Sequence, residues 1–589
     1  SNKEIIILYK DKNNQKKELS IYSPWYFYVN LDFIEQIKFL MHKYGYSNQL
    51  KQIIEEFKYE KENNYYKVYT DKFHYLANKN NLKIFNKYKF NDYYWEFIKL
   101  LEKYKIPHFE IDIDIIDRFS TINNIKFTNN IKKLFYDIET DDAGESFTEK
   151  AIIEKRILSV ALCDDNKNTT WFCAKENTDK GEKELLLDIF DFIKDYDCLI
   201  AWNGKNFDEK KLLARFKYHN INIQKDYYFW VDHLIIYQTY HTKNINDSGI
   251  TIQSYSLDNI AQIELDKSKI KFNGKVVDLF KNDRDKLREY NINDVLLLYE
   301  IEEKTNFIDT ELIQCRISNT FANGIGFLTH KLENLVLSYC NQNNYHFLER
   351  RKYQKEMDSY EGAYVHVPNP GIYENVCAFD FKSLYPSLLL AFNISPETYL
   401  GKNICEIYDY NEEDIIKTSD GKYFRKDKEG FIPIIMHQLN QMRNKYSEAQ
   451  NECKIDSKEY INNYNLMYAY KRLSLALYGC FGSYSSRLKN FDLAECITLN
   501  GQYFIKETMS IAEKMNHFPL YGDTDSLFVK IDEKDVPEFM EKCKQRYEDL
   551  ENEFNSSLFT LGNRIGDGVP AEIAFAKVAQ STRGQKTSE

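Results

Sequence analysis

The pattern of hydrophobic and polar residues changes along the chain. Residues 1–130 alternate aromatic strand-like runs with lysine-rich amphipathic stretches, which predicts an accessory domain without a catalytic cluster. Residues 131–310 place short apolar runs between helical patterns, with the apolar runs at 134–138, 158–162 and 198–202 and a helical pattern at 183–196. Such alternation is typical of an α/β domain with a central sheet.

A second region follows with a different order of elements. A helical connection is predicted over about 310–350, followed by strand-like runs at 363–367 and 376–381. Two long helical patterns then span 434–453 and 457–478, and a strand hairpin is predicted around 521–531. This part of the chain is therefore expected to be an α+β region, and the whole chain a multidomain α/β and α+β protein.

Composition narrows the class of protein. The chain has 589 residues, of which 43% are hydrophobic and 29% charged, so it is globular and too long for a small binding module. No apolar run approaches the about 18 residues of a membrane helix, and no signal peptide is predicted at Ser1. The 11 cysteines contain no C-x-x-C, so reduced thiols and an intracellular site are expected. The net charge of −11 does not indicate nucleic acid, although a basic groove can coexist with an acidic exterior.

Four carboxylates in the α/β region follow strand ends or lie on a helix. Asp137 and Glu139 lie two residues apart on one predicted strand, so they share a side and repel each other unless a cation lies between them. Asp208 follows the apolar run 199–202, and Tyr290 and Asp294 are one helical turn apart. Any single aspartate is more often a helix cap or a solvated acid. The series as a whole favours a functional site over that alternative.

A second carboxylate set lies in the α+β region. Asp380 interrupts the apolar run 376–381, and a buried carboxylate needs a cation or a base as partner. Asp523 and Asp525 share a face of the predicted hairpin turn. Pro386 suits the first turn of a helix whose free N–H groups can hold phosphate oxygens. Lys471 and Tyr478 lie on one stripe of a predicted helix and Arg443 on the helix before it. Fixed cations opposite a carboxylate pair indicate a triphosphate site.

These motifs, in this order, resemble those of family B DNA polymerases. F-Y-D-I-E-T at 135–140, N-x-x-x-F-D at 203–208 and Y-x-x-x-D at 290–294 are similar to the three exonuclease motifs of the proofreading domain, and S-Y-S-L at 254–257 resembles the same domain. D-F-K-S-L-Y-P-S at 380–387, K-x6-Y-G at 471–479 and Y-G-D-T-D-S at 521–526 are similar to polymerase motifs A, B and C. Y-E-G-A at 360–363 resembles the segment that joins exonuclease and palm, so the resemblance covers about 131–530.

The resemblance implies a DNA-directed DNA polymerase with a 3′→5′ proofreading exonuclease. Two Mg²⁺ or Mn²⁺ ions are expected in each active site. At the exonuclease site they are held by Asp137, Glu139, Asp208 and Asp294, with Tyr290 orienting the attacking water. At the polymerase site Asp380 and Asp525 hold the metals and Asp523 supports them.

The resemblance also implies a nucleotide site. Arg443 and Lys471 are expected to hold the triphosphate, and Tyr385 to lie under the sugar and exclude a 2′-hydroxyl. Further substrate-binding residues are expected at Ser383, Leu384, Tyr478, Tyr360 and Gly362. For Tyr478 a place as a core aromatic is the alternative. The expected partners are primer-template DNA and dNTPs, with a sliding clamp, an accessory factor or a thumb-bearing subunit as further candidates and no membrane.

The implied domains are an RNase H-like exonuclease domain and a palm and fingers polymerase domain behind the N-terminal domain. Their expected bounds are an accessory domain at 1–130, the exonuclease at 131–310, the connection and first part of the palm at 311–433, the fingers at 434–480, and the second part of the palm at 481–589. A thumb is expected to be absent, because the family pattern after motif C is not found up to Glu589.

One motif departs from the family pattern, and alternatives to a polymerase with a proofreading exonuclease remain. Leu475 stands where motif B usually has asparagine, so a polar contact to the nucleotide is expected to be missing. The alternatives are an exonuclease with weak or lost polymerase activity, a non-catalytic partner subunit that only binds primer-template, and a subunit of a split polymerase. The intact Asp380 and Asp525 argue against the first two. Nothing in the sequence distinguishes a cellular, viral or mobile-element source, or a protein primer from a nucleic acid primer.

Overall fold

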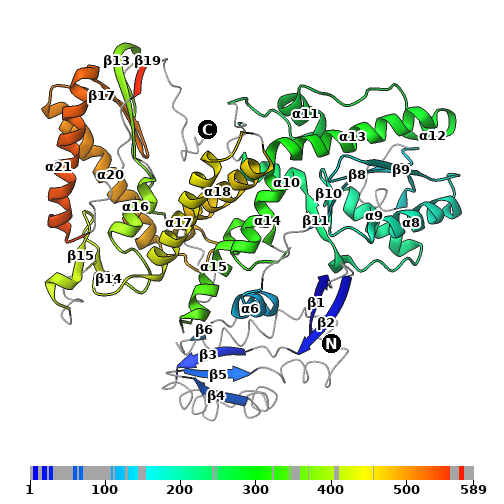
Figure 1. The fold of residues 1–589 in the computed structure, drawn as a ribbon, viewed down its shortest axis with the longest axis horizontal. Helices are drawn as coiled ribbons and strands as arrows, with labels where there is room; N and C mark the ends of the chain where they lie inside the picture. The colour runs from blue at the N-terminus through cyan, green and yellow to red at the C-terminus, as the bar shows by residue number, and fades with distance from the viewer. Residues whose placement is uncertain are drawn as a thin grey trace, which may run out of the picture. The chain divides into compact units, whose positions relative to one another are not determined.

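The computed structural model divides the chain into two compact units (Figure 1). The first contains Ser1–Ser23 and Ile115–Lys331, and the second contains Pro24–Asp114 and Leu332–Glu589. The structure describes residues 113–125, 131–143, 154–241, 245, 249–321, 324–343, 345–346, 359–368, 370–381, 383–402, 410–455 and 457–556, and the backbone of seven further strands at 4–10, 16–22, 26–30, 58–62, 65–69, 108–109 and 569–575. Each unit is considered by itself below.

The N-terminal strands are distributed over both units. β1 (Glu4–Lys10) and β2 (Lys16–Tyr22) form an antiparallel pair in the first unit. In the second unit, β3 (Tyr26–Asn30), β4 (Lys58–Glu62), β5 (Tyr65–Tyr69) and β6 (His108–Phe109) form a sheet in the order β4-β5-β3-β6. Much of the predicted accessory domain at 1–130 lies outside the described residues, so its extent stays a prediction.

The core of the first unit is a five-stranded sheet in the order β11-β10-β7-β8-β9. β7 runs parallel to β10 and β10 parallel to β11, whereas β7, β8 and β9 are antiparallel. The strands are β7 (Lys133–Thr140), β8 (Ile157–Asp164), β9 (Thr169–Cys173), β10 (Cys198–Ala201) and β11 (Phe229–Asp232). The predicted strands at 134–138, 158–162 and 198–202 are thereby confirmed to within a few residues.

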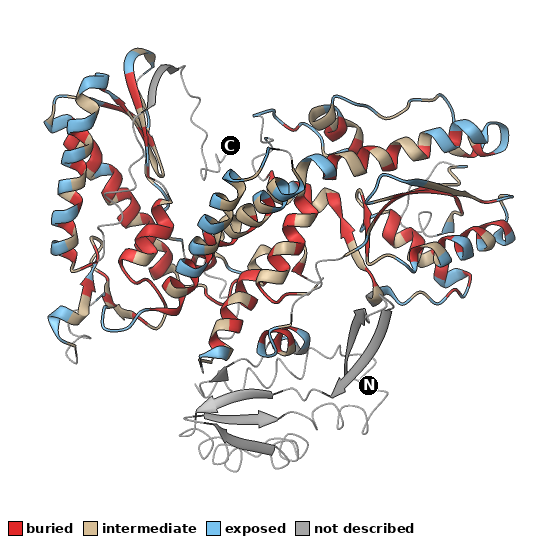
Figure 2. Ribbon diagram, viewed as in Figure 1, coloured by how far each residue is buried: buried red, intermediate tan, exposed pale blue. Residues whose placement is uncertain are grey.

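Helices cover both faces of this sheet, because its strands are apolar on both sides. On one face Leu134, Tyr136 and Ile138 pack with residues of α8 (Asp179–Ile193) and α9 (Asp208–Tyr218). On the other face Phe135 packs with α10 (His233–Tyr240), α11 (Leu257–Leu265) and α13 (Arg284–Thr305). Figure 2 shows the buried residues concentrated along these strands and inward helix faces. The unit also contains α6 (Ile115–Ile122), η1 (Lys225–Tyr227), α12 (Val276–Asn282) and α14 (Phe307–Ile317).

The second unit is built on an antiparallel sheet in the order β12-β17-β18-β13-β19. Its strands are β12 (Val365–His366), β13 (Gly371–Asp380), β17 (Phe518–Asp523), β18 (Ser526–Lys530) and β19 (Val569–Phe575). Two helices, α20 (Phe491–Lys514) and α21 (Val536–Phe554), pack beside it; the rings of Phe379 and Phe539 lie 5.0 Å apart. The predicted hairpin around 521–531 is the β17–β18 pair.

A long helical hairpin projects from the second unit (Figure 1). It consists of α17 (Phe431–Asn451) and α18 (Lys458–Leu477), which pack along each other, with the rings of Tyr446 and Tyr470 stacked at 5.8 Å. Both predicted helices at 434–453 and 457–478 are confirmed. The remaining elements are α15 (Leu328–Gln342), α16 (Leu384–Ala391), β14 (Tyr399–Gly401), η4 (Glu412–Asp414), β15 (Ile415–Lys417), β16 (Tyr423–Arg425), α19 (Gly479–Gly482) and η5 (Glu533–Asp535).

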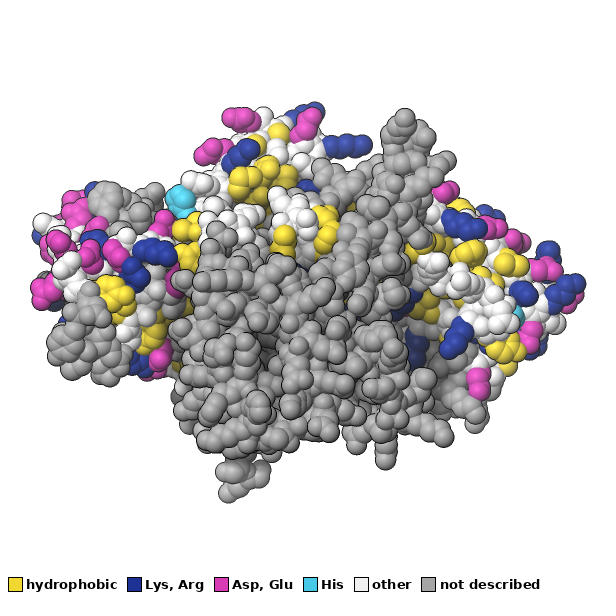
Figure 3. Space-filling view, turned by 90° about the horizontal axis from the view of Figure 1, so that it is seen from below, with side chains coloured by type: hydrophobic (Ala, Val, Ile, Leu, Met, Phe, Trp, Pro, Cys, Tyr) yellow, Lys and Arg dark blue, Asp and Glu magenta, His cyan; other side chains and the backbone are white. Residues whose placement is uncertain are grey.

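The predicted fold class, α/β together with α+β in more than one domain, is confirmed. Among the described residues, no helix has the length and apolar character needed to cross a membrane. On the face drawn in Figure 3, acidic and basic side chains are interspersed over the described surface. The net charge of −11 is therefore not gathered into one acidic patch on that face.

Candidate active sites

Three carboxylates of the first unit come together beside β7. Asp137 and Glu139 lie on the same side of β7 as Phe135, and this side faces α13, which carries Asp294. One ligand oxygen from each of the three lies within 4.8 Å of the others. The strand therefore supplies two acids by its period of two, and the helix supplies the third.

Asp208 joins this cluster from a different direction. It begins α9, directly after the loop that follows β10, and its Oδ1 accepts a hydrogen bond of 3.2 Å from the backbone N–H of Ile138. Its carboxylate is buried, with 5% exposure. Asp208 is not among the three residues whose oxygens lie within 4.8 Å, but its pKa is raised by burial and then by the charge of Asp137.

The electrostatics of the cluster favour a cation. Burial, followed by the charge of Asp294, raises the pKa of Asp137 to about 7, and burial is also the largest cause that raises the pKa of Glu139 and Asp294. Oδ1 of Asp294 is buried without a hydrogen-bond partner in the described part of the chain. Hard divalent cations prefer carboxylate oxygens, so this donor set fits Mg²⁺ or Mn²⁺.

Two polar residues that the sequence did not single out contact these acids. Lys269 Nζ lies 2.7 Å from Asp294 Oδ2, and although burial lowers the pKa of Lys269, the charges of Asp294 and Asp137 outweigh it and raise that pKa. Asn291 Nδ2 donates to Asp137 Oδ2 at 2.7 Å and to the backbone oxygen of Asp137 at 3.2 Å. Asn291 lies inside the Y-x-x-x-D motif, at a position that the motif leaves free. Lys269 has no spacing relation to any motif, so only the fold could find it.

Tyr290 lies beside the same carboxylates. Its ring makes an edge contact with Phe272 at 5.0 Å, which holds the ring in place. Burial, followed by the charges of Glu139 and Asp294, raises the pKa of the Tyr290 hydroxyl. The hydroxyl therefore stays protonated and able to donate a hydrogen bond at neutral pH. The structure thus brings all five predicted residues of the first site into one neighbourhood.

In the second unit, three aspartates meet at the end of the sheet. Asp380 is the last residue of β13 and pairs with Ser526 of β18, while Asp523 is the last residue of β17 and pairs with the same serine. The backbone N–H of Phe381 donates to the backbone carbonyl oxygen of Asp525 at 2.8 Å, which joins the end of β13 to the hairpin turn. Burial, followed by the charge of Asp380, raises the pKa of Asp525.

The three aspartates differ in their surroundings. Asp523 already accepts two hydroxyl hydrogen bonds, from Tyr521 at 3.2 Å and from Thr524 at 2.8 Å. Thr524 has a positive φ of 60°, and this turn conformation brings its hydroxyl back onto Asp523. Asp380 is exposed, because it is the last residue of β13, so the expectation that its carboxylate is buried was wrong; Asp525 is half-buried. The expectation that Asp380 and Asp525 are ligands while Asp523 supports them agrees with these contacts and stays a prediction.

Basic side chains from the helical hairpin lie at the start of α16. Ser383, also at positive φ, precedes α16, and Arg443 Nη1 of α17 lies 3.5 Å from its hydroxyl oxygen. Lys471 of α18 pairs with no carboxylate among the described residues. Pro386 occupies the first turn of α16, as expected from the sequence. Free N–H groups and the Arg443 guanidinium thus lie together where an anion is expected to bind, and the role of Lys471 in that site stays a prediction.

Tyr385 is packed into a narrow site between helices. Its ring makes an edge contact with Tyr478 at 4.8 Å, and on its other side a Cβ added to Gly501 of α20 would lie 2.9 Å from its Cε1. Tyr385 is only 8% exposed, and its neighbour Leu384 is buried in the core. Tyr478 therefore contacts a predicted site residue, while its part in nucleotide binding stays a prediction.

The segment at 360–363 contacts α19 and α20. Gln502 Nε2 donates to the backbone oxygen of Gly362 at 2.8 Å, and a Cβ at Gly482 would collide with the Tyr360 hydroxyl. Leu475, which replaces the usual asparagine, is 38% exposed. Its neighbour Ser474 donates to Asn440 Oδ1 of α17 at 2.8 Å.

Both candidate sites lie in regions of the chain that match known protein families. Residues 326–561 match the model of DNA polymerase family B, and residues 134–306 match the model of the RNase H superfamily. The predicted resemblance is thereby confirmed: the chain contains a family B DNA polymerase region preceded by an RNase H-like domain.

Several archaeal DNA polymerases are similar to the chain. DNA polymerase 1 of Sulfurisphaera ohwakuensis is 28% identical over 407 residues, which cover 64% of this chain and 45% of that protein. The DNA polymerase of Archaeoglobus fulgidus is 35% identical over 191 residues, 32% of this chain and 23% of that protein. The chain thus matches less than half the length of these two relatives. The solved family B DNA polymerase of Pyrobaculum calidifontis has the same fold, with a TM-score of 0.68 at 19% identity, over 92% of this chain and 74% of that one.

Proposed function

We propose that the chain is a DNA-directed DNA polymerase with a 3′→5′ proofreading exonuclease. The observation that carries this proposal is the presence of two carboxylate sets, one in the RNase H-like region and one in the family B polymerase region. Similarity to proteins named DNA polymerase supports it. Phosphodiester hydrolysis and nucleotidyl transfer both use paired metals held by such acids.

At the exonuclease site, Asp137, Glu139, Asp208 and Asp294 would hold two divalent metals. When bound, these metals activate a water and stabilise the leaving 3′ oxygen. Tyr290 donates a hydrogen bond to orient that water, and Lys269 offsets part of the negative charge of the four acids. Asn291 fixes the orientation of the Asp137 carboxylate through its amide N–H.

At the polymerase site, Asp380 and Asp525 would hold two Mg²⁺ or Mn²⁺ ions. When bound, these metals favour ionisation of the primer 3′-hydroxyl and neutralise the pyrophosphate. Arg443 and Lys471 bind the triphosphate, together with N–H groups at Ser383 and Leu384. Tyr385 lies under the sugar, and Tyr478, Tyr360 and Gly362 support it, so a 2′-hydroxyl finds no room.

The proposed domains are named as in family B DNA polymerases. Residues 131–310 form the exonuclease, 311–433 and 481–589 the palm, and 434–480 the fingers, behind an accessory domain at 1–130. Primer-template DNA and dNTPs are the proposed substrates, which makes an intracellular site of action the expected one. A sliding clamp, accessory factor or thumb-bearing subunit is a further candidate partner.

A primer-extension assay tests the proposal. A labelled primer annealed to a longer template should be shortened with Mg²⁺ alone and extended when all four dNTPs are added. Shortening without extension would favour the second candidate, an exonuclease with weak or lost polymerase activity. The observation that supports this candidate is the exposed Leu475 of α18, which stands where motif B usually has asparagine. If the primer were neither shortened nor extended, both candidates would be contradicted.

A further inference from the structure

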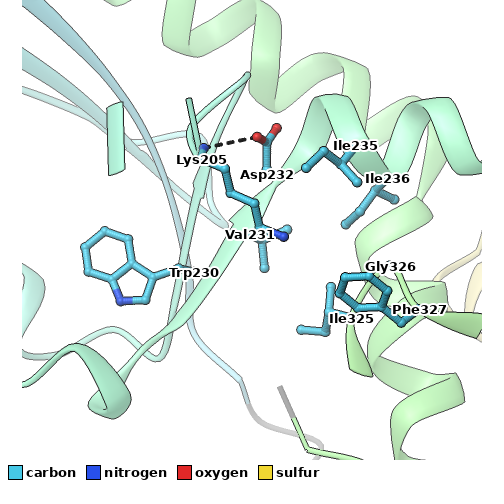
Figure 4. Close-up of a pocket in the computed structure, with 9 residues that line it drawn as sticks. All are labelled: Lys205, Trp230, Val231, Asp232, Ile235, Ile236, Ile325, Gly326 and Phe327. Atoms are coloured by element: carbon cyan, nitrogen blue, oxygen red, sulfur yellow. Dashed lines mark hydrogen bonds between the residues drawn. The ribbon is translucent and has the colours of Figure 1, made fainter. Parts of the chain in front are cut away.

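The first unit contains a cavity beside the end of β11 (Figure 4). Its volume is about 110 Å³, and its walls come from the loop after β10, the end of β11, the first turn of α10 and the turn before α15. Most of the residues that line it are hydrophobic, with Val231, Ile236 and Ile325 on the inside and Lys205 and Phe327 at its mouth. A sealed apolar cavity of about 150 Å³ can bind benzene, so this open one admits part of a single aromatic ring.

The topology of the sheet puts this cavity at the same edge as the exonuclease acids. β7, β10 and β11 are adjacent and parallel, so their carboxyl ends lie on one edge. β7 carries Asp137 and Glu139, the loop after β10 ends at Asp208, and β11 leads into the cavity. With about 4.8 Å between strands, β11 lies about 10 Å from β7. A single strand of a few nucleotides spans that distance.

The mouth of the cavity combines a cation with an aromatic face. Lys205 extends past Val231, and its Nζ lies 5.6 Å from the ring centroid of Phe327, which is 55% exposed. Within the described part of the chain, Lys205 pairs with no carboxylate. Asp232 also lines the cavity, but its oxygens accept backbone N–H groups of Asn203, Lys205 and Leu234 at 3.0 to 3.1 Å. These bonds hold the loop with Lys205 against β11.

We propose that this cavity binds one nucleobase of the single DNA strand whose 3′ end lies at the exonuclease carboxylates. The base stacks against Phe327 with its edge in the apolar cavity, and Lys205 binds the adjoining phosphate. Stacking on an exposed aromatic next to a cation is how proteins bind single strands without sequence preference. This proposal rests on the proposed exonuclease function, since the cavity lies at the same sheet edge as those acids, and that shared edge selects a DNA strand as its occupant.

Binding is measured in the full chain with Asp137→Asn and Glu139→Gln, so that the oligonucleotide is not degraded. A fluorescent single-stranded oligonucleotide is titrated at several salt concentrations. Phe327→Ala should weaken binding by about tenfold, as expected for the loss of one stacked base, and Phe327→Trp should retain it. Lys205→Ala should weaken binding and reduce the slope of log affinity against log salt by about 0.7, since one phosphate contact is lost.

Matched controls use residues of similar exposure elsewhere. Lys217→Ala, at the end of α9, and Phe518→Ala, which is 54% exposed in the second unit, should leave the affinity within about twofold. Equal losses in these controls would mean that the effect reflects general charge or hydrophobicity, and would overturn the proposal.

The decisive measurement moves a single abasic site along the oligonucleotide. At one position near the 3′ end, loss of the base should weaken binding by about the same factor as Phe327→Ala, and the two changes together should cost no more than either alone. Additive losses at every position would overturn the proposal. Shortening of the same oligonucleotide by the unmodified chain with Mg²⁺ tests the exonuclease function separately, so either can fail without the other.

Discussion

At the residue scale, Tyr385 is the group whose removal should change substrate choice most clearly. Tyr478 contacts its ring edge-on, and a Cβ at Gly501 would lie only 2.9 Å from the ring, so the ring is closely packed and holds its position. We expect Tyr385→Ala to raise ribonucleotide incorporation relative to deoxyribonucleotide by about tenfold or more, because this ratio changes tenfold for each 1.4 kcal/mol of lost discrimination. Single-nucleotide incorporation kinetics measure the ratio.

Tyr385→Phe is the matched control, because it keeps the ring and removes only the hydroxyl. The ratio should stay within about twofold of the wild-type value. If Tyr385→Ala left the ratio unchanged as well, Tyr385 would be a packing residue and the proposed sugar contact would be wrong.

Asn291 is the second residue with a specific expected effect. Its amide nitrogen donates to Asp137. Its amide oxygen accepts hydrogen bonds from the Ser159 hydroxyl at 3.0 Å and from the Trp171 indole N–H at 3.2 Å. Loss of such a supporting contact typically lowers metal affinity by about 10- to 100-fold. We therefore expect Asn291→Ala to raise the Mg²⁺ concentration for half-maximal trimming by about tenfold.

The same protein supplies the control for this variant. Nucleotide incorporation should be unchanged, because the polymerase carboxylates lie in the other unit. Asn291→Ser, which retains a donor, should recover part of the metal affinity. A lower maximal rate with an unchanged Mg²⁺ requirement would contradict the proposed role of Asn291.

At the element scale, a buried ion network fastens α8 and α9 to the sheet. Glu182 of α8 is fully buried and accepts hydrogen bonds from Arg215 and His219 at the end of α9 and from the backbone N–H of Ile157 in β8. Since α9 begins at Asp208, this network also fixes the helix that carries one candidate metal ligand. Residues as far apart as Ile157 and His219 are joined here by one carboxylate.

Glu182→Gln should destabilise this part of the molecule. The change leaves Arg215 buried without its counter-charge, which costs about 3 to 5 kcal/mol. Hydrogen exchange of the α9 amides measures the local free energy of opening. Glu184→Gln is the control on the same helix, because the Glu184 side chain is 40% exposed and pairs with Lys175 at the surface; its effect should stay within about 0.5 kcal/mol.

The same network predicts a pH dependence. Although burial opposes it, the hydrogen bonds from Arg215 and His219 lower the pKa of Glu182 in the folded chain. A carboxylate with a lowered folded pKa contributes stability that is present above the unfolded pKa of about 4.3 and is lost as the pH falls below it. The free energy of opening of α9 should therefore fall as the pH is lowered below about 4.3 in the wild type. The same change of pH should have a much smaller effect in Glu182→Gln.

At the scale of the whole molecule, the two activities should separate by mutation. Their carboxylates lie in different compact units. Asp137→Ala with Glu139→Ala should abolish trimming of single-stranded DNA and leave incorporation within a few-fold, whereas Asp525→Asn should stop incorporation and spare trimming. Trimming and extension of one labelled primer are measured in parallel. Loss of both activities in a chain that remains folded would contradict the assignment of two independent sites.

Local patterns along the chain were sufficient for much of the first site. Asp137 and Glu139 share a side because any strand alternates its side chains, and Tyr290 and Asp294 share a face because any helix repeats after about four residues. Both elements formed where the apolar pattern predicted them. The aspartates of the second site were found in the same way, since a hairpin brings its two ends together.

The sequence by itself determined the strands, the helical hairpin and the acids, because each depends on a period or turn within a few residues. Only the tertiary structure decided which face of β7 meets α13, and so placed Asn291 against Asp137, 154 residues away in the chain, and Lys269 against Asp294. It also decided that Gly501 backs Tyr385 and that Lys205 meets Phe327 at a cavity mouth. Such contacts depend on how whole elements pack, and packing leaves no period in the sequence that would reveal it.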